Sequence, residues 1–210
     1  MVVKVCGLRD PDNLAEVAEA KPDMVGFICY PQSPRYVEAA AAKALNSVSV
    51  GNAQRVGVFV DSNLQHIEQT VAHFGFHAVQ LHGSETPQLC EQLQQKGLTV
   101  IKAFRVEEKF CFTEVEPYVG SCSLFLFDAA GSRAGGNGIS FNWHLLEKYG
   151  GSVPFLLSGG IGEDHLLAIK ALKHPMLLGV DINSRFEVVP GVKDSLLVKN
   201  FIELLKSESC

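Results

Sequence analysis

The sequence lacks the cysteine pattern of a disulfide framework or of a zinc site. Its 210 residues include six cysteines, at positions 6, 29, 90, 111, 122 and 210, and none of them forms a C-x-x-C pair. A structural zinc site needs clustered ligands, and a disulfide framework is typical of small, cysteine-dense secreted chains. We therefore expect reduced thiols, mostly in the core, and no metal site.

Long apolar runs and blocks of like charge are also absent. No run approaches the roughly 20 apolar residues that span a bilayer, and Lys4 interrupts an N-terminal apolar stretch already too short for a signal peptide. The formal net charge is −5, without a basic stripe for nucleic acid or an anionic membrane. We expect a cytoplasmic protein without nucleic-acid or membrane partners. Any anionic ligand would be held by local groups, because the net charge repels it.

What the sequence does contain is a series of short apolar runs along the whole chain. Most are continuous rather than alternating, which is typical of strands buried on both faces. The runs cover residues 2–6, 24–29, 55–60, 77–82, 99–104, 124–129, 154–160 and 177–182.

Helical patterns separate these predicted strands. They cover residues 10–20, 63–75, 85–97, 163–173 and 195–207, and the pattern at 108–120 is the weakest. Eight strands, each followed by a helix at a repeat of roughly 20–30 residues, predict an α/β fold of the (β/α)₈ TIM-barrel type. No change of composition marks a linker, so we expect a single domain over residues 1–210. An open, doubly wound parallel sheet is the alternative.

Polar residues stand where the predicted strands end. Active sites of (β/α)₈ barrels lie at the carboxyl ends of the strands. Cys6 ends the first strand, where a buried core would accept valine or alanine equally well, and Gln80 and His82 end the fourth. His82 is either a donor to a ligand or a structural histidine on the rim.

Asp128 ends the sixth strand, after four large apolar residues. Desolvation raises the pKa of a carboxyl group, which suits a general acid near neutral pH. The alternative is a carboxylate that caps a turn. Glycines at 131, 135, 136 and 138 follow and predict a long mobile loop that could act as a lid.

The ends of the last two strands resemble a phosphate site. Gly159 and Gly160 follow the seventh strand, and paired glycines let backbone N–H groups point at an anion. Asn183 and Ser184 end the eighth strand, and the sequence PGVKD at 190–194 predicts the start of a short helix facing the same spot. Barrels bind phosphate in the loops after strands 7 and 8.

Arg35 lies in the loop after the second strand, directly behind Ser33 and Pro34. The proline stiffens the approach, and a guanidinium can form a two-pronged pair with a carboxylate. The alternative is a solvated loop arginine.

Seven motifs follow one another in an order that resembles a known family. They are K-V-C-G at 4–7, G-F-x-x-x-x-x-S-P-R at 26–35, G-V-F-V at 57–60, V-Q-L-H-G at 79–83, D-A-x-x-x-x-x-G-G-x-G at 128–138, L-S-G-G at 157–160 and G-V-D-I-N-S at 179–184. Together they resemble the phosphoribosylanthranilate isomerases of tryptophan biosynthesis along the whole chain.

The resemblance implies a role for each candidate residue. Cys6 would be the general base, Asp128 the general acid, and Arg35 the partner of the substrate's anthranilate carboxylate. The remaining expected substrate contacts are His82, Gly159, Gly160, Asn183 and Ser184. The implied reaction is an internal Amadori rearrangement of a phosphosugar–anthranilate substrate. It needs no cofactor, and we expect a monomer or a homodimer.

Three alternative functions stay open at this point. The Amadori isomerase of histidine biosynthesis uses two aspartates, and Cys6 argues against it. Indoleglycerol-phosphate synthase needs a lysine at a strand end, for which Lys102 is the candidate. A non-catalytic barrel that binds a phosphorylated ligand is the third.

Overall fold

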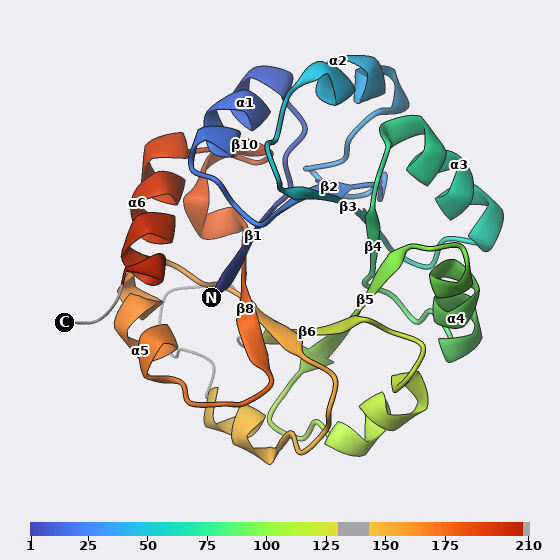
Figure 1. Cartoon of the computed structure of the whole chain (residues 1–210), viewed down its shortest axis with the longest axis vertical. Helices are drawn as coiled ribbons and strands as arrows, with labels where there is room; N and C mark the ends of the chain where they lie inside the picture. The colour runs from blue at the N-terminus through green and yellow to red at the C-terminus, as the bar shows by residue number, and fades with distance from the viewer. Residues whose placement is uncertain (130–142, 208–210) are drawn as a thin grey trace.

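The computed structural model describes residues 1–129 and 143–207. The predicted lid glycines and Cys210 lie outside the described residues. Eight parallel strands close into a barrel in which each strand pairs with the next and β8 pairs with β1 (Figure 1). They are β1 (Val2–Cys6), β2 (Met24–Ile28), β3 (Gln54–Phe59), β4 (Ala78–Leu81), β5 (Thr99–Val106), β6 (Leu124–Ala129), β7 (Phe155–Ser158) and β8 (Leu177–Ile182). The TIM-barrel prediction is confirmed, and the open-sheet alternative is wrong because β1 has a strand on both sides.

Helices surround the barrel (Figure 1). They are α1 (Pro11–Glu19), α2 (Ala42–Ser47), α3 (Leu64–Phe74), α4 (Pro87–Gln95), α5 (Leu166–Ala171) and α6 (Ser195–Lys206). Helix α1 starts as its sequence predicts, since the Asp10 carboxylate accepts a hydrogen bond from the Asn13 N–H at 2.8 Å and proline follows the cap. None of the described helices is long and apolar enough to cross a membrane.

Short 3₁₀ helices replace or extend several α-helices. They are η1 (Ala39–Ala41), η2 (Phe112–Tyr118), η3 (Trp143–Lys148), η4 (Glu163–His165) and η5 (Ser184–Phe186). The weak pattern at 108–120 forms only η2, which contains Pro117, a residue without a backbone donor. The pattern at 163–173 splits into η4 and α5. Helix α2 was not predicted, because its alanine-rich sequence offers no stripe of large apolar side chains.

The short helix predicted from PGVKD is wrong. Residues 187–193 form a hairpin of β9 (Glu187–Val189) and β10 (Val192–Lys193). Gly191 has φ +87°, a left-handed conformation that suits a tight turn and not a helix. Asp194 then caps α6, since its carboxylate accepts from the Leu197 N–H at 2.9 Å.

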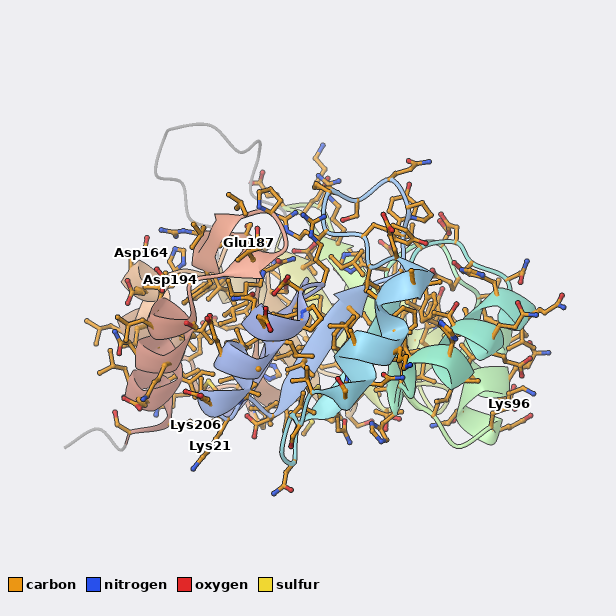
Figure 2. The ribbon with its side chains drawn as sticks, turned by 90° about the horizontal axis from the view of Figure 1, so that it is seen from above. Lys21, Lys96, Asp164, Glu187, Asp194 and Lys206 are labelled. Atoms are coloured by element: carbon orange, nitrogen blue, oxygen red, sulfur yellow. The ribbon has the colours of Figure 1, made fainter. Side chains whose placement is uncertain are left out.

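The barrel interior is filled by apolar side chains in its middle layer and by polar side chains toward the carboxyl ends of the strands. Its apolar cluster includes Met24, Val56, Ala78, Ile101, Ala103, Leu124, Leu126 and Leu156. Side chains alternate along a strand, so the inward residues two positions further on form the next layer toward the carboxyl end. Figure 2 shows the barrel from the side. Glu187 and Asp164, which follow β8 and β7, mark the carboxyl end of the strands at the top of the view. The other end, at the bottom, is marked by Lys21, Lys96 and Lys206. The fold thus gathers the predicted site residues on a filled apolar base.

Candidate active site

A cavity of about 230 Å³ opens at the carboxyl ends of the strands. Its lining consists of Cys6, Ile28, Val58, Gln80, His82, Asp128, Ser158, Gly159, Gly160, Ile161, Asp181, Asn183 and Ser184. The structure therefore brings together every predicted site residue except Arg35. In the closed barrel β7 and β8 separate β1 from β6, so Cys6 and Asp128 enter the cavity from different sides.

The Cys6 thiol is buried at the end of β1, with 3% of the residue exposed. Burial raises the pKa of Cys6 above its ordinary value, and the ammonium of Lys4 beside it offsets only part of this rise. Without a bound substrate the thiol form is therefore favoured, and reaction as a base requires either a minority of thiolate or a further lowering of the pKa by the ligand.

Lys4 is a functional candidate that the sequence reasoning missed. Its ammonium is fully buried in the barrel and donates to Asp181 Oδ1 at 2.9 Å, while Ser158 Oγ lies 3.4 Å from Asp181 Oδ2. Lys4 and Asp181 are register partners on β1 and β8. The sequence pattern that could have identified Lys4 is its place in a buried strand, two residues before Cys6. This spacing puts the side chains of Lys4 and Cys6 on the same face of the strand.

We expect Lys4→Met to destabilise the fold by about 3–5 kcal/mol, because it leaves the buried Asp181 carboxylate without its cation. Chemical denaturation measures the loss as a lower transition midpoint with unchanged slope. The double variant Lys4→Met/Asp181→Leu removes both charges and should recover most of the stability. A single variant as stable as the parent would contradict this account of the pair.

Gln80, His82 and Asp128 form a chain of contacts on the cavity wall. His82 Nε2 lies 3.3 Å from Asp128 Oδ2, and Gln80 Nε2 lies 2.9 Å from His82 Nδ1. The Asp128 side chain is 32% exposed, so its carboxylate keeps more solvent contact than its apolar approach predicts. Gln80 Oε1 is buried and has no hydrogen-bond partner among the described residues.

The loops after β7 and β8 lie against each other. Gly159 and Gly160 have φ of +99° and +63°, conformations that L side chains rarely adopt. The Arg185 guanidinium, which follows Ser184, donates to the Asp164 carboxylate at 2.9 Å and thereby connects the two loops. The predicted glycine turn is present, and it lines the same cavity as Asn183 and Ser184.

Arg35 lies beside this cavity and does not line it. Its Nε and Nη2 atoms donate to both carboxylate oxygens of Glu187, with a shortest distance of 2.6 Å. Only 20% of the Arg35 side chain is exposed. The interpretation as a solvated loop arginine is therefore wrong, and Glu187 is a second residue that sequence reasoning missed.

Lys102 does not reach the cavity. It stands between Ile101 and Ala103, which face the barrel interior, so its own side chain points outward. Its ammonium donates to the backbone oxygens of Leu81, Gly83 and Ala103 and to the Glu85 carboxylate. A synthase reaction that needs this lysine at the site has no support here.

These features define a TIM-barrel enzyme with a candidate active site at the carboxyl ends of the strands. A sequence model of the family described as N-(5'phosphoribosyl)anthranilate (PRA) isomerase matches residues 3–204. The N-(5'-phosphoribosyl)anthranilate isomerase of Phocaeicola vulgatus is 41% identical over 208 residues, covering 99% of each chain. The chain belongs to the phosphoribosylanthranilate isomerase family.

Two solved structures are similar to the whole chain. A phosphoribosyl anthranilate isomerase in complex with reduced 1-(o-carboxyphenylamino)-1-deoxyribulose 5-phosphate is 30% identical, with a TM-score of 0.82 over 98% of this chain and 99% of that one. Monomers generated from the dimeric enzyme of Thermotoga maritima are 28% identical, with a TM-score of 0.82 over 99% and 100% of the two chains.

Proposed function

We propose that this chain converts N-(5'-phosphoribosyl)anthranilate to 1-(2-carboxyphenylamino)-1-deoxyribulose 5-phosphate in tryptophan biosynthesis, with Asp128 as general acid and Cys6 as general base. The observation that carries the proposal is a thiol and a carboxylate on different sides of one cavity. The test is turnover: substrate fluorescence should decrease with time when the protein is added in catalytic amounts. A non-catalytic binder would change the signal only in proportion to its own concentration.

Asp128 opens the sugar in the first step. Its carboxyl group donates a proton to the furanose ring oxygen, and the bond from C1′ to that oxygen breaks. The lone pair of the anthranilate nitrogen forms the C1′=N bond of a protonated Schiff base. His82, 3.3 Å from Asp128 Oδ2, holds the carboxyl group at this side of the cavity.

Cys6 then acts as a thiolate and takes the proton from C2′. The electron pair of that C–H bond forms the C1′=C2′ double bond, and the C=N electrons return to nitrogen to give an enolamine. Transfer of a proton from the C2′ hydroxyl to C1′ completes the ketone. Electrons only move within the substrate, so no oxidant or reductant takes part. The Lys4 ammonium stabilises the thiolate while it forms.

Four residues of the last two loops would hold the phosphate. Gly159, Gly160, Asn183 and Ser184 lie together on the cavity wall. The left-handed conformation of both glycines bends the backbone and leaves no side chain between it and an anion. The net charge of −5 makes such a local site necessary.

Arg35 would bind the carboxylate of the anthranilate ring. With the phosphate at the ends of β7 and β8, the ring extends toward the neighbouring strands β1 and β2, and Arg35 follows β2. Arg35 is the one cationic residue in the sequence of that loop, residues 29–38.

Arg35→Met should raise KM for phosphoribosylanthranilate by about ten- to a hundredfold, because a charge-assisted pair contributes about 1.5–3 kcal/mol. Steady-state kinetics measures this change. Lys109→Met is the control, because Lys109 is an exposed cation in the loop after β5, at the same end of the barrel. Inorganic phosphate should inhibit the variant and the parent alike. An unchanged KM, or a parallel loss of phosphate affinity, would contradict the assignment.

Arg35→Met should also reduce stability, because the variant loses the contact with Glu187. Replacing an exposed arginine without such a contact would not reduce stability.

Compartment and assembly complete the proposal. The cysteines 6, 29, 90, 111 and 122 are all free thiols, which is compatible with the reducing cytoplasm. The chain would act as a monomer or a homodimer, and the dimeric Thermotoga maritima relative supports the second form. Analytical ultracentrifugation distinguishes the two.

A further inference from the structure

The pairing of Arg35 with Glu187 joins the loop after β2 to strand β9, 152 positions further along the chain. Arg35 Nε lies 2.8 Å from Oε1 and 3.0 Å from Oε2 of Glu187, and Nη2 lies 2.6 Å from Oε2. The carboxylate thus occupies one particular edge of the guanidinium, the edge formed by Nε and Nη2.

Glu187 is itself held firmly in place. Its side chain is 4% exposed, and its Oε1 accepts from Lys193 Nζ at 2.8 Å and from the Gly191 N–H at 3.1 Å. Lys193 is fully buried and also donates to the backbone and side-chain oxygens of Asn183, at 3.2 and 2.7 Å. Figure 2 places Glu187 at the carboxyl end of the barrel. The carboxylate is therefore a fixed support and not a mobile surface group.

The second edge of the guanidinium is still available. Arginine has five N–H donors, and Glu187 uses those of Nε and one side of Nη2. Within residues 1–129 and 143–207, no hydrogen bond is formed by Nη1. The Nη1–Nη2 edge can therefore receive a second carboxylate with two parallel bonds.

The stem of Arg35 lies next to residues of the active-site cavity. A Cβ atom on Gly7 would lie 2.9 Å from Arg35 Cδ and 2.8 Å from Asn183 Oδ1. The arginine stem therefore passes close to Gly7, the residue that follows Cys6, and to Asn183 of the cavity wall. Arg35, Lys193 and Glu187 carry two positive charges and one negative charge, so one positive charge remains for an anion.

We propose that Glu187 is a positioning residue, whose carboxylate fixes the Arg35 guanidinium with its Nη1–Nη2 edge free for the carboxylate of the substrate. The inference rests on the proposed role of Arg35. The positioning role differs from a competitive role. In a competitive role, Glu187 would occupy the place of the substrate carboxylate on Arg35 and would leave when substrate binds. The two roles predict opposite changes of KM.

The test is the kinetics of Glu187→Gln with two substrates. The glutamine retains the shape but loses the charge and one of the two acceptors of the guanidinium. KM for phosphoribosylanthranilate should rise about tenfold, equivalent to about 1.4 kcal/mol, with kcat little changed. KM for the analogue without a carboxylate, N-(5'-phosphoribosyl)aniline, should not move. Equal rises for both substrates would show a merely structural role, and a fall in KM would show competition; either result overturns the proposal.

A double variant separates this inference from the role of Arg35 itself. If Glu187 acts through Arg35, adding Glu187→Gln to Arg35→Met should raise KM no further. An additive rise would overturn the positioning role. If Arg35→Met alone leaves KM unchanged, the proposed carboxylate contact fails. If Arg35→Met raises KM and Glu187→Gln does not, only the positioning role fails. Circular dichroism and thermal unfolding confirm that each variant is folded.

Discussion

Replacing Cys6 with alanine is expected to lower kcat by about 10²–10⁴-fold, the range for loss of a general base, while a product analogue still binds. The thiol stands at the cavity end of β1 without a disulfide partner among the described cysteines. Single-turnover kinetics and analogue titration measure the two quantities separately. A kcat close to that of the parent would refute the base assignment.

Cys29→Ala is the matched control, because Cys29 is also a buried thiol at the carboxyl end of a barrel strand and is 4% exposed. Burial raises the pKa of Cys29 to about 12, and it does not line the cavity. Its replacement should change kcat less than about threefold. A large loss in this variant would indicate that packing at this end of the barrel, and not the thiolate of Cys6, limits the reaction.

The raised pKa of Cys6 also predicts the pH dependence. A base works only when deprotonated, so a pKa above the ordinary value means that the thiolate fraction still increases with pH above neutrality. The parent also needs its general acid protonated, and a rising pH opposes that requirement. The base is therefore read in Asp128→Asn, which lacks the acid and whose residual kcat/KM should rise by about tenfold per pH unit from about pH 7 until the thiol titrates. The residual activity of Cys6→Ala should lack this rise.

Asp128→Asn is expected to reduce kcat by about 10²–10⁴-fold with little change in KM, because the amide keeps the shape of the carboxyl group but cannot donate the catalytic proton. Asp61→Asn is the matched control. Asp61 follows β3 and accepts from the Ser84 N–H at 2.7 Å, and asparagine tolerates its φ of +49°. A loss below tenfold in Asp128→Asn would mean that Asp128 is only structural.

The sequence predicted the barrel because its strands leave a strong local signal. Strands buried on both faces are continuous apolar runs, and Asp10 and Gly75 mark helix ends by local hydrogen bonding and backbone conformation. The hairpin at 187–193 was missed because it is short and its apolar residues Val188 and Val189 are exposed, so apolar periodicity does not mark it. Helix α2 was missed for the related reason that alanines carry little amphipathic contrast.

The cavity residues were predictable because the fold places every strand end in one ring. For that reason Cys6, His82 and Asp128, which end different strands, all line one cavity. Lys4 with Asp181 and Arg35 with Glu187 were different, since each pair joins residues more than 150 positions apart. Such pairs depend on strand register and loop conformation, which one sequence does not contain as a local pattern. The roles of the cavity residues came from the family resemblance, and the variants above test them.

The buried pair of Lys4 and Asp181 has a consequence for how the chain is made. A ribosome adds about 5–20 residues per second, so the separation of 177 positions between the two partners corresponds to roughly 10–35 seconds of synthesis. During that time the Lys4 cation has no counter-charge, and dehydrating it inside a half-built barrel would cost several kcal/mol. The first strand must therefore stay hydrated until the eighth arrives. Closure of the barrel becomes a late event that requires both ends of the chain, and a truncated product that lacks β8 would expose an unpaired strand edge to chaperones and proteases.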